Sequence, residues 1–198
     1  MPPNKRRIVM RINHGTDVLL IVDFQNDFIT GSLAVPGAED LIPIINKYIS
    51  MFWKIVLSRD RHKKGHPSFA AQGGIWPDHC IDGTFGMEIH PKLSFPEGMI
   101  LPIIDKGRDK EAYSAFERTD MADLLGAMWA KRLFICGLAT DYCVKNTALD
   151  AVKEFAGEVF LLTDAIKAVN VNPADGEKAI KEMKDAGVIL ITLDDLED

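Results

Sequence analysis

Short, continuously apolar segments alternate along the chain with longer segments in which apolar residues recur every three to four positions. The apolar segments lie at 17–23, 54–60, 99–107, 132–137, 158–165 and 188–193. Strands that are apolar throughout, and that helical segments separate, are typical of a parallel sheet covered on both faces. The sequence therefore predicts an α/β fold, a doubly wound three-layer sandwich around a six-stranded, mainly parallel sheet.

Helical periodicity fills most of the intervals between these strands. Helices are predicted over 38–53, 119–131, 140–155 and 173–187. The interval 61–98 is different, because it is rich in Gly, Pro, His and aromatic residues and shows no sustained period. A loop of that length inside a compact domain indicates a functional role.

Size, charge and cysteine content limit the class of protein. With 198 residues, 47% of them hydrophobic, the chain can bury a full core in one domain. A net charge of −6, with acids and bases interspersed, opposes a dominant nucleic-acid or anionic-membrane surface. Three separated cysteines without CxxC pairs, no evident signal peptide and no apolar run near ~18 residues predict a reduced, cytoplasmic protein.

The first stretch of the chain, MPPNKRRIVMRINHG, differs because it carries four basic residues and no acid. One short basic cluster is common at chain termini, so we expect a solvated or loosely docked extension rather than a binding arm. The predicted division is a basic N-terminal extension over 1–16 and one domain over 17–198. We expect a small-molecule substrate, no nucleic-acid or membrane partner, and assembly as a homo-oligomer.

Cys143 lies in the run FICGLATDYCVKNTALDAV, where an apolar strand leads through a glycine turn into the predicted first turn of a helix. Unpaired N–H groups and the helix dipole favour a thiolate at such a position, and the thiolate is the nucleophilic form. A free cysteine is nevertheless often an inert core residue. The functional assignment therefore depends on what surrounds the thiol.

Two further polar residues follow predicted strands. Asp23 ends the first strand and Lys106 lies at the end of the third, while Cys143 follows the fourth. Ligands of open α/β sheets bind outside the carboxyl ends of the strands, so these three side chains are expected to face one crevice. A carboxylate can accept the thiol proton and an ammonium favours the ionised forms, which makes Asp23 the expected base. A Cys/His dyad is the weaker alternative, because no histidine is near Cys143 in the sequence.

A second cluster lies in the long loop, in SRDRHKKGHPSF and GIWPDHC. Asp60 and His62 are two residues apart in an extended segment, so their side chains leave the same face, and His79 arrives from the far side of the loop. Two histidines and one carboxylate form a three-ligand metal site with open positions. His66 is a candidate for a further ligand. The alternative is a polar loop whose histidines are solvated or only hydrogen-bonded. His14 and His90 are expected to be surface residues.

Taken together, IVDFQNDF, SRDRHKKGHPSF with WPDHC, IDKG and GLATDYCVKNTALDA resemble the isochorismatase-like cysteine hydrolases, and within them the nicotinamidases. The resemblance spans roughly residues 17–193, with the motifs in family order. It implies Cys143 as nucleophile, Asp23 as proton shuttle and Lys106 as third member of a catalytic triad. The expected activity is the hydrolysis of nicotinamide to nicotinate and ammonia through a cysteine thioester, with pyrazinamide as a possible second substrate.

The resemblance also implies a metal and substrate site. Asp60, His62 and His79 match the ligands of one divalent ion, expected to be Zn²⁺, with Fe²⁺ or Mn²⁺ as alternatives. In such enzymes the pyridine nitrogen contacts the metal, which places the carboxamide over the sulfur. Phe28 and Trp76 match positions whose aromatic rings flank the substrate.

The family further has a cis peptide before the helix, here Leu138–Ala139, which would direct the backbone N–H groups of Ala139 and Cys143 at a developing oxyanion.

The chain departs from the family pattern at two places, the basic N-terminal extension and the KKG segment after His62. The rival functions are hydrolysis of another small amide or ureido compound, and a non-catalytic pyridine-binding protein. The cysteine disfavours isochorismate hydrolysis, and the metal residues disfavour the carbamoyl amidases.

Overall fold

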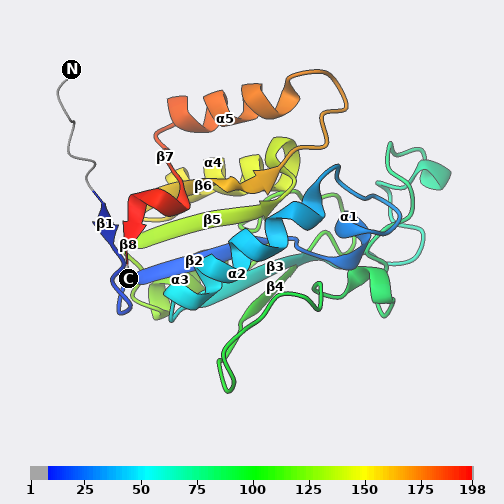
Figure 1. Ribbon diagram of the computed structural model, residues 1–198. Helices are drawn as coiled ribbons and strands as arrows, with labels where there is room; N and C mark the ends of the chain where they lie inside the picture. The colour runs from blue at the N-terminus through cyan, green and yellow to red at the C-terminus, as the bar shows by residue number, and fades with distance from the viewer. Residues whose placement is uncertain (1–8, 198) are drawn as a thin grey trace.

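A computed structural model describes residues 9–197 and contains a six-stranded, entirely parallel sheet in the order β4-β3-β2-β5-β6-β7 (Figure 1). Its strands are β2 (Asp17–Val22), β3 (Ile55–Asp60), β4 (Ile103–Lys106), β5 (Arg132–Leu138), β6 (Glu158–Lys167) and β7 (Ile189–Ile191). All six lie within or overlap the predicted segments. The predicted fold class and the predicted strand number are confirmed, and the sheet is parallel throughout.

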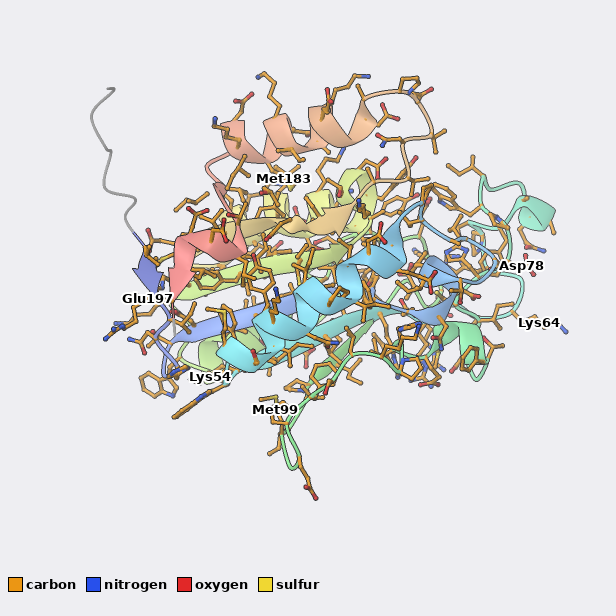
Figure 2. All side chains as sticks on the ribbon, in the orientation of Figure 1. Lys54, Lys64, Asp78, Met99, Met183 and Glu197 are labelled. Carbon is orange, nitrogen blue, oxygen red and sulfur yellow. The ribbon has the colours of Figure 1, made fainter. Side chains whose placement is uncertain are left out.

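Helices cover both faces of the sheet. They are α1 (Asn26–Ile29), α2 (Ile42–Met51), α3 (Met121–Ala127), α4 (Lys145–Glu154) and α5 (Asp175–Asp185). Figure 1 shows α2 lying across the face of the sheet that is turned toward the viewer. Apolar residues of α3, α4 and α5 pack on the other face, as Met183 of α5 does (Figure 2). The arrangement is the expected three-layer sandwich.

The alternation of side chains along the central strand accounts for the two cores. In β2, Leu19 and Ile21 belong to the core beneath α2, whereas Val18, Leu20 and Val22 belong to the core beneath α3, α4 and α5. Successive side chains of a strand point to opposite faces, so a strand between two helical layers must be apolar at every position. The unbroken apolar run of this strand therefore encodes its central place in the sheet.

Several helix boundaries differ from the sequence prediction. The helix predicted to begin at residue 38 starts with the 3-10 turn Ala38–Leu41 before α2, so Pro43 occupies the second position of the α-helix. Helix α3 ends at Ala127, because Trp129 adopts a left-handed backbone with φ 56°. The helix predicted from residue 173 begins at Asp175, after Ala174 with φ 67°.

A second, two-stranded sheet was not predicted. Strand β1 (Met10–Arg11) pairs in parallel with β8 (Leu196–Glu197). The neighbouring Ile12 is buried and belongs to the core beneath α2. The N-terminal extension predicted over 1–16 therefore packs on the domain from residue 9 onward. Its basic residues at 5–7 lie outside the residues that the structure describes. Among residues 9–197, no helix is long and apolar enough to cross a membrane.

Candidate active site

Four polar side chains meet at the carboxyl end of the sheet, each from a different strand end. Asp23 directly follows β2, and Asp60 and Lys106 are the last residues of β3 and β4, where they are register partners. Cys143 lies in the π-helical turn Thr140–Val144 that follows β5. Because these parallel strands are neighbours, their ends lie along one edge of the sheet. The structure thus brings together Asp23, Lys106 and Cys143, which the sequence placed in one crevice.

Lys106 is the centre of this cluster. Its Nζ lies 2.8 Å from Asp23 Oδ2 and 3.4 Å from Cys143 Sγ, and it donates a hydrogen bond of 2.6 Å to Asp60 Oδ1. A fourth contact, at 3.3 Å, joins Nζ to the carbonyl oxygen of Ala112. The side chains of Lys106 and Asp23 are fully buried. One ammonium group therefore links the predicted triad to the predicted metal carboxylate, a connection that the sequence did not predict.

Burial and charge set the ionisation of these groups. Burial raises the pKa of Asp23 above its ordinary value, although the ammonium of Lys106 opposes that rise. Burial would lower the pKa of Lys106, but the carboxylates of Asp23 and Asp60 outweigh it and raise that pKa. For Asp60, burial is outweighed by Lys106, so its pKa lies below the ordinary value. Lys106 is therefore a cation and Asp60 an anion.

Burial and charge act on the Cys143 thiol in opposite directions. Burial raises the pKa of this thiol, and the neighbouring ammonium of Lys106 lowers it without offsetting the effect of burial. The helix start, which favours a thiolate, therefore acts against burial at this site. Carboxylate oxygens of Asp23 and Asp60 and the sulfur all lie within 4.8 Å of one another. The thiol thus has a carboxylate close by that can accept its proton.

The backbone of β3 is held beside this cluster by Gln25. The Gln25 side chain accepts a hydrogen bond from the Asp60 N–H at 2.7 Å and donates one to the Asp60 carbonyl at 2.8 Å. It also donates to the Met87 carbonyl at 2.8 Å. Since Gln25 is fully buried, these bonds satisfy an amide that would otherwise be costly to bury. The glutamine fixes Asp60 next to Lys106.

Asp60, His62 and His79 form one group of potential metal ligands, whose donor atoms lie within 4.8 Å of one another. All three residues are buried. The two segments meet because the His62 N–H donates to the Cys80 carbonyl at 3.0 Å and the Asp82 N–H to the His62 carbonyl at 2.8 Å. The structure thus brings together the three ligands expected from opposite ends of the long loop.

The imidazole contacts fit a metal centre. His79 Nδ1 lies 2.8 Å from the Pro77 carbonyl, and His62 Nδ1 contacts the Gly107 carbonyl. A ligating histidine commonly donates its other ring N–H to such a carbonyl, which orients the free nitrogen toward the metal. His62 Nε2 is buried, 3.5 Å from Asp60 Oδ2, and meets no hydrogen-bond partner among residues 9–197. Burial also lowers the pKa of His79, which favours the neutral, ligating form.

His66 lies beside this group without belonging to it. Its ring stacks on His62 with centroids 4.3 Å apart, and its Nδ1 lies 2.7 Å from Ser68 Oγ. Its Nε2 is buried and has no hydrogen-bond partner within the described chain. A role for His66 as a further ligand therefore stays a prediction.

A cavity of about 40 Å³ opens beside Cys143. Phe28, Trp76 and Ala139, all named from the sequence, line it together with Asp60 and His79. The cavity is mainly apolar apart from the thiol and the metal group. It therefore suits a small, largely apolar ligand.

Five residues of the cavity wall were missed by sequence reasoning, namely Leu33, Val35, Tyr113, Tyr142 and Val169. Tyr113 accepts a hydrogen bond from Trp76 Nε1 at 3.1 Å and donates one to Glu111. The Tyr142 ring contacts the Trp76 ring with centroids 4.9 Å apart. Leu33, Val35, Tyr113 and Val169 lie outside helices and strands and follow no periodic pattern. The position of Tyr142 next to Cys143 is a signal that could have found it.

The peptide Leu138–Ala139 is cis, as the family resemblance implied. Ala139 lines the cavity beside Cys143, and its carbonyl accepts hydrogen bonds from Tyr142 and Val144 at 3.1 Å. The role of the Ala139 and Cys143 N–H groups in binding an oxyanion stays a prediction.

Two histidines expected at the surface are placed differently. His90 is only 7% exposed, because its ring packs edge-on against Phe24 and its backbone N–H donates to the Phe24 carbonyl at 2.9 Å. His14 is partly buried and stacks on Trp53 with ring centroids 4.3 Å apart. The surface assignment is therefore wrong for His90 and incomplete for His14.

The fold and this site define a three-layer α/β sandwich that carries a thiol, an acid and a lysine at neighbouring strand ends. The Isochorismatase domain model matches residues 17–195, and the chain belongs to that family. The nicotinamidase of Escherichia coli is 36% identical over 208 residues, which cover 91% of this chain and 96% of that protein.

Solved structures agree with this relationship. The pyrazinamidase of Pyrococcus horikoshii in complex with zinc is 44% identical, with a TM-score of 0.82 over 89% of this chain and 99% of that one. PnC1 from L. infantum in complex with nicotinate is 38% identical, with a TM-score of 0.87 over 96% of this chain and 98% of that one. The chain is therefore similar, over nearly its whole length, to relatives named for the hydrolysis of pyridine or pyrazine carboxamides.

Proposed function

We propose that this protein is a nicotinamidase, which hydrolyses nicotinamide to nicotinate and ammonia and accepts pyrazinamide as a further substrate. The observation that carries the proposal is the contact of Lys106 with both Asp23 and Cys143, beside a small cavity that is bordered by a three-ligand metal group. Relatives at 36% identity carry the name nicotinamidase, which supports the same conclusion. Such an enzyme would serve the salvage of NAD.

In the proposed first step, Asp23 removes the proton from the Cys143 thiol as the sulfur attacks the carboxamide carbon. A carbon–sulfur bond forms and the carbonyl π electrons move to oxygen. Backbone N–H groups of Ala139 and Cys143 would stabilise this oxyanion, and one such donor typically supplies ~3 to 4 kcal/mol. The ammonium of Lys106 stabilises the negative charge as it moves from the carboxylate to the sulfur.

In the second half of the reaction, protonated Asp23 gives its proton to the amide nitrogen as the carbon–nitrogen bond breaks. Ammonia leaves, and a thioester on Cys143 remains. Asp23 then takes a proton from a water molecule, whose oxygen attacks the thioester carbon. The carbon–sulfur bond breaks, the sulfur regains a proton and nicotinate is released. Asp23 therefore acts alternately as base and acid.

Asp60, His62 and His79 would hold one divalent ion, for which we propose Zn²⁺, with Fe²⁺ and Mn²⁺ as alternatives of similar ligand preference. An ion held by these residues would supply a positive charge to a lone pair of the substrate. The zinc complex of the Pyrococcus horikoshii relative supports the assignment.

Removal of a ligand is expected to release the metal. Both His62→Ala and His79→Ala should lower metal affinity by more than the ~10- to 100-fold caused by loss of an outer-sphere partner. Metal content by mass spectrometry and titration of the chelator-treated protein with Zn²⁺ measure the effect. His90→Ala serves as the control, because it removes a buried imidazole outside the group. Unchanged zinc affinity in both ligand variants would refute the assignment, whereas a loss in His66→Ala would add that residue to the ligand set.

Loss of the Tyr113 hydroxyl is expected to loosen the cavity wall. Tyr113→Phe removes the acceptor for Trp76 Nε1, and one neutral hydrogen bond contributes about 0.5 to 1.5 kcal/mol. We therefore expect a KM for nicotinamide about 3- to 10-fold higher, with kcat within about 2-fold of the unaltered protein. Steady-state kinetics measure both constants. A fall in kcat at constant KM would show that Tyr113 acts on the chemical step instead.

The proposed function is tested by ammonia release from a panel of amides. Nicotinamide and pyrazinamide should release ammonia, and a chelator should suppress release. Carbamoyl and ureido compounds represent the second candidate, an amidohydrolase for another small substrate, and preferential turnover of these would support it. No release from any compound, combined with nicotinate binding in calorimetry, would support a non-catalytic pyridine-binding protein.

Assembly and location are also proposals. We expect a homo-oligomer in the cytoplasm that binds neither nucleic acid nor membranes. Sedimentation at several protein concentrations tests the oligomeric state, and a monomer at every concentration would contradict it.

A further inference from the structure

Ser58 contacts the carboxylate of Asp23 from the side opposite to the lysine. Its Oγ donates a hydrogen bond of 2.7 Å to Asp23 Oδ1, while Lys106 Nζ lies 2.8 Å from Oδ2. The backbone of Ser58 also contributes, because its carbonyl accepts a hydrogen bond of 3.1 Å from the Asp23 N–H. Ser58 and Asp23 are both fully buried. The carboxylate is thus held at each oxygen by a different strand.

The lysine alone does not fix the orientation of that carboxylate. Lys106 Nζ also contacts Asp60, Cys143 and Ala112, so its three N–H groups are shared among four neighbours. The terminal torsion of an aspartate is broad and nearly two-fold, so a second tether is needed to fix the plane of the group. The Ser58 hydroxyl supplies that tether at Oδ1.

We propose that Ser58 is a positioning residue for the reaction, which fixes the Asp23 carboxylate in the orientation that accepts the proton of Cys143. This inference rests on the proposed function, in which Asp23 is the base and the acid. Ser58 does not contact the sulfur, so it acts only through Asp23. A hydrogen bond to a charged acceptor typically contributes about 1.5 to 3 kcal/mol.

The sheet itself does not require a hydroxyl at this position. The three residues before Ser58 in β3 are apolar and buried, so alanine would satisfy the packing pattern of the strand. The side chain hydrogen bond that the serine makes is directed at the catalytic carboxylate. Loss of the hydroxyl is therefore expected to affect the chemical step more than the fold.

The test compares Ser58→Ala with Ser58→Thr, which keeps the hydroxyl. In Ser58→Ala we expect kcat for nicotinamide to fall roughly 10- to 100-fold with KM within about 2-fold, and in Ser58→Thr we expect kcat to recover to within about 5-fold. Thr163→Val is the matched control, since Thr163 donates to the Ile191 carbonyl of the neighbouring strand, away from the site. If Ser58 had a purely structural role, Ser58→Ala would instead lower the stability of the fold without a selective fall in kcat at constant KM.

A second measurement does not depend on the substrate. The rate at which iodoacetamide alkylates Cys143, followed by peptide mass spectrometry, should fall in Ser58→Ala by a factor similar to that of kcat. If the unaltered protein does not hydrolyse nicotinamide, the proposed function fails, yet the alkylation rates still test the link from Ser58 to Cys143. Alkylation and kcat within 2-fold of the unaltered protein in Ser58→Ala would overturn the inference. If that variant does not fold, Ser58→Cys, which keeps the size of the side chain, is judged by the same criteria.

Discussion

Replacement of Cys143 by alanine is expected to abolish ammonia release from nicotinamide, with kcat lowered roughly 10⁴-fold or more, as for other catalytic nucleophiles. The variant should still fold, because the change removes a single sulfur atom and leaves Lys106 paired with Asp23 and Asp60. Ammonia release is measured in a coupled assay. Acid quenching followed by mass spectrometry should reveal a nicotinoyl thioester on the unaltered protein and none on the variant.

Cys136→Ala is the matched control for this prediction. Cys136 is also fully buried, but it lies on β5 within the core beneath α2 and lines no part of the cavity. Burial raises the pKa of both thiols, so burial alone does not distinguish them. The control should retain kcat within about 2-fold. Turnover near the ordinary rate in Cys143→Ala would exclude the covalent mechanism.

The strand pattern and the strand-end rule account for what the sequence could predict. Each apolar run is encoded locally, and the carboxyl ends of neighbouring parallel strands lie at one edge, so Asp23, Lys106 and Cys143 could be placed in one crevice from the sequence alone. The same logic placed Asp60 and His62 on one face of an extended segment. His79 was added through an interpretation of the loop, and the chemistry of the side chains indicated Asp23 as the base. The family resemblance supplied the substrate and the place of Lys106 in a catalytic triad.

The remaining features depend on contacts that no local pattern encodes. Ser58 appears in the sequence as one polar residue at the end of an apolar strand, and its partner is 35 residues away. Gln25 has an ordinary place after a strand, yet its amide binds the backbone of Asp60, also 35 residues away. The helix start that favours a thiolate at Cys143 is visible in the sequence, whereas the burial that raises the pKa of this thiol is not. Long-range packing, rather than periodicity, determines these properties.

Lys106→Met is expected to remove both activity and a large part of the folding free energy. The ammonium lies between two buried carboxylates, 2.8 Å from Asp23 Oδ2 and 2.6 Å from Asp60 Oδ1. Removal of one partner of a buried ion pair leaves uncompensated charge and costs about 3 to 5 kcal/mol. Urea unfolding of the chelator-treated variant measures the loss, and kcat should fall by several orders of magnitude because the thiolate loses its stabilising cation.

The loss of stability in Lys106→Met should depend on pH with a definite sign. The ammonium lowers the pKa of both carboxyl groups, so without it burial raises the pKa of Asp23 further and raises that of Asp60 as well. A carboxyl group whose pKa is higher in the folded state binds its proton more tightly there, so the folded state is favoured at low pH and disfavoured as pH rises through that pKa. The difference in unfolding free energy between variant and unaltered protein should therefore be larger near pH 8 than near pH 5. An equal difference at both pH values would show that Lys106 stabilises by packing alone.

The double variant Asp23→Asn/Lys106→Met separates the structural contribution of the lysine from its chemical one. The single variant Lys106→Met leaves two buried carboxylates without a cation, whereas the double variant leaves one. Part of the lost folding free energy should therefore return, and the pH dependence of the unfolding free energy should weaken. Turnover should not return, because the base and the cation are then both missing beside Cys143. The ammonium of Lys106 stabilises both the folded state and the developing thiolate. Adding Asp23→Asn to Lys106→Met is therefore expected to restore part of the stability but none of the activity. Recovery of turnover in the double variant would show that Lys106 serves only to balance buried charge, and would contradict its place in the proposed mechanism.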